Sequence, residues 1–464
     1  MAEHWNSREL SDRAVSHRVC FVTRFVIKNE QTKAGAPAFS LNGPAMPCGI
    51  MNLCYNIEKR LYWRFLNLES FSIRQWSSGL WAASGGSDGD GGFQMDFNFH
   101  MPVHVVSGEG AVARNSTLLR TLGRRCLIVT GGSSAKLSGA LADVMAALDL
   151  WEIGWSVYDG IGPNPLVSAC HEAGVVARRV RAEFIIGIGG GSPLDAAKAT
   201  AIFAANEALS PMDIFQREGA NPPLPLALIG TTAGTGSEVS PVSVLTIDES
   251  GRKKSISGAD CYARIAFADP AYTHSAPFRV TVSTALDAFA HATEGWFSPH
   301  LSDPVRLFAV KGLPMRWNGL VWLDKNTHLP DRKMRERLYY GSLYAGIVLS
   351  ACGTAFPHPL GYVLTEDFGI PHGRACTAFL PAFLERGKEF EPERAEAYYQ
   401  VLGTDDETLR GVVERLTDAS AVHMTPEQVR QYCSRWGDVK NFRVSPGGFT
   451  ANDAGALLTR LFVR

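Results

Sequence analysis

The sequence predicts an α/β domain followed by an all-α domain, and three observations support this prediction. Apolar runs of strand length alternate with segments of helical periodicity from residue 124 to about residue 275. Two of these runs break into loops rich in glycine and threonine. Beyond residue 276 the helical periodicity continues, while clear runs of strand length disappear. We therefore expect an α/β domain over residues 95–275 and an all-helical domain over residues 276–464.

Residues 1–94 do not follow this pattern. They carry four of the ten tryptophans, little sustained periodicity and a terminal "SGGSDGDGG" typical of a flexible linker. We interpret them as an atypical extension that is disordered or not native, with Met95 as the natural start. The alternative is a small accessory region.

The α/β elements follow in order. A first strand is expected in "MDFNFHMPVHVV" (95–106), a second in "RRCLIVTGG" (124–132) and a helix in "SAKLSGALADVMAALD" (134–149). "WEIGWSVYDG" (151–160) predicts a strand and "LVSACHEAGVVARRV" (166–180) a helix. "AEFIIGIGGGSPLDAAKATAIFA" (182–204) predicts a strand, a glycine loop and a helix, and "PLALIGTTAGTGSEVSP" (225–241) a strand that ends in a second loop. Alternation of this kind indicates a parallel sheet with helices on both faces.

Four segments predict helices in the C-terminal part: residues 279–297, 303–313, 332–351 and 425–437. No internal repeat is visible.

Composition excludes several classes of function. The chain has 45 Lys+Arg against 46 Asp+Glu and a pI of about 6.9, so it has no long-range field for nucleic acid or an anionic membrane. No apolar run reaches the roughly 18 residues of a membrane span, and the polar start has no secretory apolar region. Nine scattered cysteines without a CxxC pair favour reduced thiols. We expect a cytoplasmic enzyme that acts on small molecules.

The loop "GIGGGSPLDAAKA" (187–199) follows a buried strand and opens a helix. Glycine lets the backbone approach a pyrophosphate, amides at a helix start carry positive partial charge, and Ser192 can add a hydroxyl donor. The spacing departs from G-x-G-x-x-G, and a tight turn without a ligand is the alternative. "TTAGTGSEVS" (231–240) is a second such loop. Two loops of this kind after neighbouring strands favour a dinucleotide.

Asp287 and His291 lie four residues apart on a predicted helix, so both side chains share one face. Alone, this pair is typical of an exposed carboxylate–histidine contact. With His358 and His372 the set becomes three imidazoles and one carboxylate, which suits Fe(II) or Zn(II) better than calcium or magnesium.

Residues 95–464 resemble the iron-containing (group III) alcohol dehydrogenases. The resemblance rests on "FNFHMPVHVVSGEGA", "YDGIGPNP", "GIGGGSPLDAAKA", "TTAGTGSEVSPVSVLTID", "FADP", "DAFAHATEG" and "GIPHGRACTAFLP". It implies a dinucleotide-binding α/β domain, an all-helical domain as in dehydroquinate synthase-like folds, a metal between the two, and a homodimer. Residues 1–94 have no counterpart.

The resemblance also assigns residues. By position, the family's metal ligands match Asp287, His291, His358 and His372, and its cofactor contacts match Asn164, Gly190, Gly191, Ser192, Asp195, Thr231, Thr232, Thr235 and, less closely, Lys254.

One ambiguity in the ligand register is resolved by spacing. The string "HPLG" at 358–361 invites a register that expects ten residues between the ligands and places the first ligand at Thr354. The family separation is fourteen, and 372 − 358 = 14, so His358 is the matching ligand. Tyr362 then takes the place of the family's second histidine, and we predict that it relays a proton or packs beside the nicotinamide.

The end of the second strand departs from NAD-preferring relatives. Gly131 in "IVTGG" stands where those relatives resemble "VTD", with an acid for the ribose 2′-hydroxyl. Without that acid, NADP should be tolerated as well as NAD.

The resemblance implies a metal-dependent, NAD(P)-linked oxidoreductase that interconverts an alcohol and its aldehyde or ketone. Maleylacetate reductase and hydroxy-acid dehydrogenase specificities stay open. The alternatives are a non-redox cyclase or lyase resembling dehydroquinate synthase, and a redox-inactive binding protein.

Overall fold

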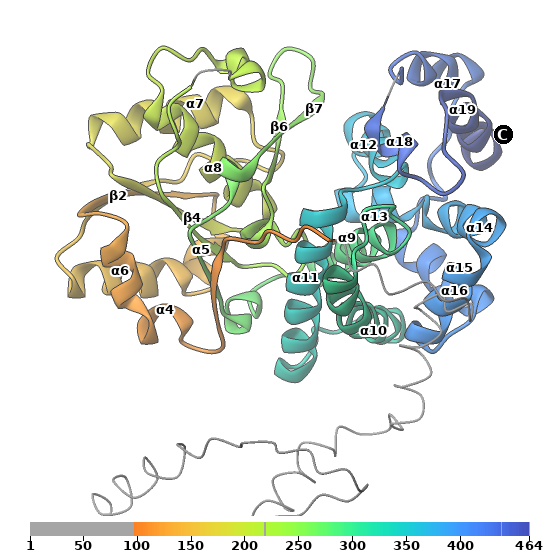
Figure 1. The fold of residues 1–464 in the computed structure, drawn as a ribbon, viewed down its shortest axis with the longest axis horizontal. Helices are drawn as coiled ribbons and strands as arrows, with labels where there is room; N and C mark the ends of the chain where they lie inside the picture. The colour runs from red at the N-terminus through yellow and green to blue at the C-terminus, as the bar shows by residue number, and fades with distance from the viewer. Residues whose placement is uncertain (1–96, 218–219, 438, 464) are drawn as a thin grey trace, which may run out of the picture. The chain divides into compact units, whose positions relative to one another are not determined.

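Six parallel strands form the centre of the α/β part in this computed structural model, which describes residues 97–217, 220–437 and 439–463 (Figure 1). Their order across the sheet is β1-β8-β5-β4-β2-β3, and every neighbouring pair is parallel. All six carboxyl ends therefore lie along one edge of the sheet. The strands are β1 (His104–Ser107), β2 (Arg125–Thr130), β3 (Gly154–Tyr158), β4 (Phe184–Gly189), β5 (Leu226–Gly230) and β8 (Ile265–Ala268).

Helices cover both faces of this sheet (Figure 1). Leu127 and Val129 of β2 belong to the core shared with α7 (Val167–Arg179) and α8 (Gly191–Ala205). Cys126 and Ile128 belong to the opposite core, shared with α6 (Ala140–Leu150). Because successive strand residues face opposite sides and both sides are buried, these strands read as continuous apolar runs. The shorter helices of this part are α4 (Ala111–Arg114), η1 (Ser116–Thr121), α5 (Ser134–Leu137), η2 (Pro211–Gln216), η3 (Ser237–Val239), η4 (Ala259–Cys261) and η5 (Pro270–Thr273).

Three local features differ from the sequence prediction. The first strand begins only at His104, and residues 97–103 are not in a strand. The helix predicted over 134–149 is two helices, because Gly139 adopts a left-handed backbone with φ 85° between them. An antiparallel hairpin of β6 (Val242–Thr246) and β7 (Lys253–Ser257) follows the second glycine loop.

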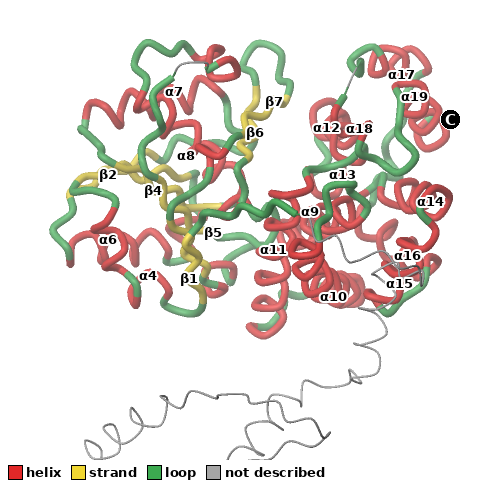
Figure 2. Tube along the Cα trace, viewed as in Figure 1, coloured by secondary structure: helices red, strands yellow, loops and turns green. Residues whose placement is uncertain are grey.

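The C-terminal part consists of helices joined by loops, with no strand among its described residues (Figure 2). Its helices are α9 (Phe278–Trp296), α10 (Asp303–Lys325), α11 (Arg332–Cys352), α12 (Pro357–Phe368), α13 (His372–Thr377), α14 (Leu380–Phe390), α15 (Pro392–Leu402), α16 (Asp406–Thr417), α17 (Pro426–Cys433), α18 (Lys440–Arg443) and α19 (Ala451–Phe462). The predicted order, α/β elements first and helices afterwards, is confirmed.

The α/β and helical parts contact each other closely next to the second glycine loop. Gly236 of that loop lies against Gly346 of α11, and a Cβ atom built on Gly346 would stand 2.7 Å from the Cα atom of Gly236. The fully buried guanidinium of Arg316 in α10 donates to the carbonyl oxygens of Ala233 in the loop and Thr284 in α9, at 3.3 and 3.1 Å. These contacts fix α9 beside the edge of the sheet where the loops emerge.

Several sequence predictions concern the chain as a whole. The extension at residues 1–94 lies outside the described residues, and the domain boundary near residue 275 stays a prediction that falls between Thr273 and Phe278.

Six cysteines fall in the described part, and all six are free thiols. Among the described helices, none alone is long and apolar enough to span a membrane, and the pair α11 and α12, bent by 112°, meets the length and composition criteria only when taken together.

Candidate metal centre

One face of α9 carries three buried ionisable side chains. Asp287, His291 and Glu294 follow one another at intervals of four and three residues, so they line one side of the helix. Their exposed fractions are 4%, 5% and 1%. Charged and imidazole groups are rarely buried to this extent without partners, so this face must meet other polar groups.

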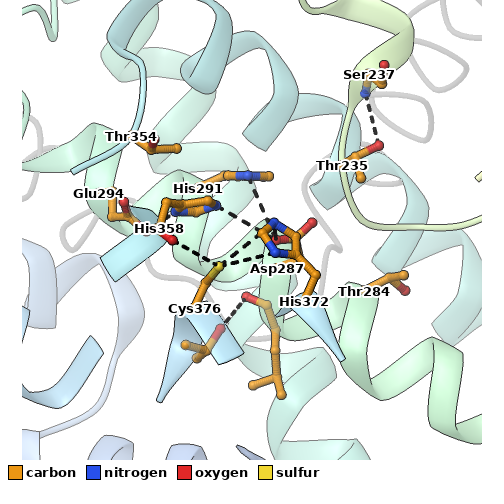
Figure 3. Close-up of polar contacts among 12 residues, drawn as sticks. Thr235, Ser237, Thr284, Asp287, His291, Glu294, Thr354, His358, His372 and Cys376 are labelled. Atoms are coloured by element: carbon orange, nitrogen blue, oxygen red, sulfur yellow. Dashed lines mark hydrogen bonds and ion pairs between the residues drawn. The ribbon is translucent and has the colours of Figure 1, made fainter. Parts of the chain in front are cut away.

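Two histidines from α12 and α13 meet this face (Figure 3). Asp287 Oδ1 lies 3.9 Å from His291 Nε2, 3.9 Å from His358 Nε2 and 3.7 Å from His372 Nε2. The rings of His291 and His358 stack with centroids 4.7 Å apart. The structure thus gathers the four predicted ligand side chains around one carboxylate oxygen.

The alternative register at Thr354 is not supported by its surroundings. Both oxygens of Thr354 accept hydrogen bonds from the Asn441 amide, at 2.8 and 2.7 Å. No described contact joins Thr354 to Asp287, whereas His358 is one of the groups around that carboxylate.

The polar atoms of this cluster fit a metal ion. Asp287 Oδ1 and His358 Nε2 are buried and have no hydrogen-bond partner within the described chain. Burial lowers the pKa of His291 to about 4 and that of His372 to about 3, so both imidazoles are neutral near pH 7. Neutral imidazoles and a carboxylate are donors that first-row divalent ions prefer. A cation among them would satisfy atoms that otherwise lack a partner.

Gly373 explains how α13 can come so close to α9. A Cβ atom at this position would overlap the carbonyl oxygen of Ser283 and would lie 2.8 Å from Asp287 Cβ. Because only glycine fits, the residue after His372 sets the approach that brings its imidazole to Asp287.

Glu294 and Cys376 are absent from the residues that the sequence predicts at this site. Glu294 Oε1 lies 2.7 Å from His358 Nδ1, and its Oε2 accepts the backbone N–H of Ala355 at 2.6 Å (Figure 3). Cys376 Sγ lies 3.5 Å from His372 Nδ1. The donor atoms of Cys376, His358 and His372 lie within 4.8 Å of one another. The helical spacing to His291 and to His372, three and four residues, is the signal that points to both residues.

Tyr362 stands beside the cluster. Its ring stacks on that of His372, with centroids 5.6 Å apart and an interplanar angle of 24°. Burial raises the pKa of Tyr362, so its phenol stays protonated. The ammonium of Lys253 in β7 lies 5.4 Å from the Tyr362 ring centroid.

Lys253, and not the predicted Lys254, faces this region. The pKa of Lys253 lies below its ordinary value because burial outweighs the opposing effect of nearby acidic groups. These groups are Cys376, Asp287, Glu366 and Asp195. Neighbouring strand residues point to opposite sides, so Lys254 projects elsewhere and sits 4.5 Å over the Phe215 ring.

The two glycine loops contact each other at the carboxyl ends of β4 and β5. The N–H of Thr231 donates to Gly189 O at 2.8 Å. A Cβ atom on Gly190 would lie 3.3 Å from Thr232, and one on Gly191 would lie 2.5 Å from Thr235. The loops pack so closely that a side chain at Gly191 would not fit. Gly191 and Ser192 begin α8, so their backbone amides lie at the positive end of this helix.

The other predicted cofactor contacts divide into two kinds. Asn164, exposed with φ 54°, donates its N–H to Ser192 Oγ at 3.1 Å, so the loop after β3 joins the glycine loop. Asp195 instead uses its carboxylate within the protein, accepting from Ser237 Oγ at 2.6 Å and from Val244 N at 2.9 Å. Thr231 is buried with an unpaired hydroxyl.

Comparison with known proteins gives the family. Residues 102–270 match the model for iron-containing alcohol dehydrogenase, and residues 281–433 match the model for its C-terminal domain. Sulfoacetaldehyde reductase of Bilophila wadsworthia is 30% identical over 331 residues, which cover 70% of this chain and 84% of that protein. Lactaldehyde reductase of Escherichia coli K12 is 29% identical, over 64% of this chain and 77% of that protein.

Solved structures agree with this assignment. An iron-containing alcohol dehydrogenase from Thermotoga maritima superposes with a TM-score of 0.72 and 32% identity, over 79% of this chain and 99% of that chain. A sulfoacetaldehyde reductase from Bifidobacterium kashiwanohense, solved in complex with NAD+, gives 0.70 and 26% over 79% and 99%. The chain therefore belongs to the iron-containing alcohol dehydrogenase family and is an oxidoreductase that interconverts alcohols and carbonyl compounds.

Proposed function

We propose that this activity takes place where the side chains of Asp287, His291, His358 and His372 converge. Three imidazole Nε2 atoms lie within 3.9 Å of one buried carboxylate oxygen, Asp287 Oδ1, and this arrangement is the main support for the proposal. These side chains come from three helices. A purely structural cluster would pair its polar atoms, whereas here Asp287 Oδ1, His291 Nδ1 and His358 Nε2 lack a hydrogen-bond partner within the described chain.

The four side chains would hold a divalent first-row ion, Fe(II) or Zn(II). Bound there, such an ion supplies Lewis acidity at the substrate oxygen, while NAD(P) accepts or gives the hydride. Asp287 contributes the negative charge, and His291 and His372 stay neutral because burial lowers the pKa of each. The family name favours iron, and the donor set itself accepts either metal.

The glycine loops would bind the cofactor. The backbone amides at the start of α8, with Gly190, Gly191 and Ser192, suit the pyrophosphate. Asn164 and the second-loop residues Thr231, Thr232 and Thr235 line the same edge of the sheet, where ligands bind in open α/β folds. Asp195 acts indirectly, by holding the second loop through Ser237. Lys253 lies beside the Tyr362 ring, and Lys254 stays a predicted cofactor contact.

Tyr362 packs on His372, and we assign it to the wall beside the nicotinamide rather than to an ionised base. Its protonated Oη could still relay a proton to or from the substrate oxygen, since burial raises the pKa of the phenol.

The cofactor can be NAD or NADP. Gly131, directly after β2, carries no carboxylate, and a Cβ atom there would lie 2.5 Å from Ile161 O. The position therefore has no room for an acidic side chain that would bind a ribose 2′-hydroxyl and repel a 2′-phosphate.

Small aldehydes are the substrates that the names of the relatives suggest, since those proteins reduce sulfoacetaldehyde and lactaldehyde. Maleylacetate and hydroxy acids are further substrates that undergo the same class of reaction. A cytoplasmic homodimer without nucleic-acid or membrane partners completes the proposal, in keeping with the balanced charge of 45 basic and 46 acidic residues.

The experiment is an assay of purified protein that has been stripped of metal and reloaded with Fe(II) or Zn(II). Reduced nicotinamide should be consumed with short aldehydes only after reloading. A cyclase or lyase resembling dehydroquinate synthase would instead regenerate its cofactor and give no net change in nicotinamide absorbance. That result would contradict the proposal.

A further inference from the structure

Glu294 makes two contacts that no other side chain in the site makes together. Its Oε1 is 2.7 Å from His358 Nδ1, and its Oε2 is 2.6 Å from the backbone nitrogen of Ala355. Ala355 lies just before α12, the helix that carries His358. One carboxylate therefore holds both a ligand ring and the chain that delivers it.

Both partners of Glu294 can donate, and Glu294 supplies the matching acceptors. The Ala355 N–H is a donor in every protonation state. His358 Nε2 faces Asp287 Oδ1 at 3.9 Å and has no hydrogen-bond partner. A ring whose Nε2 must offer a lone pair to a cation carries its proton on Nδ1. The carboxylate at 2.7 Å is the acceptor for that proton.

Burial makes this arrangement costly to change. Glu294 is 1% exposed and the side chain of His358 is 4% exposed, so water cannot replace either partner. The described residues around Glu294 provide no lysine or arginine ion pair, and its partners are His358 and the Ala355 amide. A buried carboxylate kept for these two contacts indicates a function beyond packing.

We propose that Glu294 is a positioning residue for the metal: it fixes the tautomer and orientation of His358 and ties the start of α12 to α9. The inference rests on the proposed role of His358 as a metal ligand. Residues that hydrogen-bond to a ligand histidine in this way typically change metal affinity by about 10- to 100-fold when they are replaced.

Glu294→Gln tests the proposal because an amide has one acceptor oxygen where a carboxylate has two. The variant can satisfy Nδ1–H or the Ala355 N–H, and its NH2 group then faces the other donor. We expect the dissociation constant for Zn(II), measured by chelator competition on the full chain, to rise about 10- to 100-fold. The visible spectrum of the Co(II)-loaded protein should also change, because His358 is reoriented.

The matched control is Glu238→Gln, which neutralises another buried carboxylate, 3% exposed, whose described contact is the Tyr339 hydroxyl at 3.4 Å. Its Zn(II) affinity should stay within about threefold of the wild-type value, since no ligand histidine touches it. If Glu294→Gln does not fold, Glu294→Asp is measured in its place. Its shorter carboxylate keeps two acceptor oxygens, so the variant should retain part of the wild-type Zn(II) affinity.

Each outcome has a distinct meaning. Wild-type Zn(II) affinity and an unchanged Co(II) spectrum in the folded Glu294→Gln protein would overturn the role of Glu294 and leave the proposed function standing. Equal losses in Glu294→Gln and Glu238→Gln would overturn it as well, since they would indicate a general effect of removing buried charge. Failure of the wild-type protein to bind any divalent ion would instead contradict the proposed function itself.

Discussion

Asp287 Oδ1 and His358 Nε2 lie 3.9 Å apart, and neither atom has a hydrogen-bond partner in the described chain. They belong to different helices, α9 and α12, separated by 71 positions in the sequence (358 − 287). Two unsatisfied buried atoms facing each other are costly unless a cation lies between them. This pair is therefore the clearest sign of a metal centre in the structure.

Asp287→Asn should remove metal binding while preserving side-chain volume. The amide is a weaker donor and carries no charge, so we expect the affinity for Fe(II) or Zn(II) to fall by at least about 100-fold, with activity lost in parallel. Metal content by mass spectrometry, measured beside turnover, checks this. His423→Ala, which removes an exposed histidine, is the control and should retain its metal. A fully active, metal-free Asp287→Asn protein would refute the ligand assignment.

Gly373→Ala should disturb the site without removing any ligand. The new methyl group would overlap Ser283 O and press on Asp287 Cβ, so α13 must move away from α9. We expect about 1–3 kcal/mol of destabilisation and lower metal occupancy. Thermal unfolding and metal analysis test this beside Gly162→Ala, where a Cβ atom meets nothing within 4 Å. Equal behaviour of the two variants would show that the close approach is unimportant.

The sequence could predict the order of elements because its signals are local. A buried parallel strand such as β4, with all six residues buried, reads as an unbroken apolar run. Spacing likewise places Asp287 and His291 on one helix face. The hairpin β6–β7 was not predicted, because its strands "VSVLT" and "KKSIS" are short and partly polar.

Other parts of the site depend on contacts between distant segments. Glu294 reads as an ordinary helical glutamate until α12 brings His358 to within 2.7 Å of it. Lys253 and Lys254 are adjacent and chemically identical, and only the register of β7 against β6 decides which one faces Tyr362. Asp195 matches a cofactor contact by position, but the backbone of β6 and Ser237 use its carboxylate.

Lys198→Met should show that a buried polar network supports the cofactor loops. The ammonium of Lys198, 1% exposed, donates to Ser237 Oγ at 2.7 Å and Val242 O at 2.6 Å, and lies 3.6 Å from Asp195 Oδ1. Removing it leaves the largely buried Asp195 carboxylate, whose side chain is 15% exposed, without its counter-charge, at a cost of about 3–5 kcal/mol. Chemical denaturation measures the loss.

The double variant Lys198→Met, Asp195→Leu is the check on that interpretation. Because it removes both charges, it should be less destabilised than the sum of the two single variants. Additive losses would mean that the two side chains act independently.

The metal-free protein should lose stability as pH falls from about 6.5 toward about 4. Burial lowers the folded-state pKa of His291 to about 4 and that of His372 to about 3, so the unfolded chain binds more protons in this range. The stabilisation from the two neutral imidazoles is fully present above the unfolded-state pKa of histidine. It disappears as pH falls through the folded-state pKa values of His291 and His372. The raised pKa of His358, caused by Glu294 and Asp287 against the effect of burial, opposes this trend only in part.

Thermal midpoints of the chelated protein across this pH range test the trend. A His291→Gln variant should give a shallower dependence, because one of the two imidazoles with a lowered pKa is gone. An unchanged slope in that variant would contradict the origin assigned to the effect.

Cofactor choice should follow from Gly131. With no acid at the end of β2, we expect kcat/KM for NADPH to equal or exceed that for NADH, within about tenfold. Steady-state kinetics with one aldehyde and both cofactors decide this, and a strong preference for NADH would show that another group recognises the ribose.

The most direct test of the metal centre is anomalous diffraction from crystals of the Fe(II)- or Zn(II)-loaded protein, collected at the absorption edge of the metal. We expect one dominant peak at about 2.0–2.2 Å from an oxygen of Asp287 and from nitrogens of His291, His358 and His372. A metal-loaded, active crystal whose only peak lies away from these four side chains would contradict it.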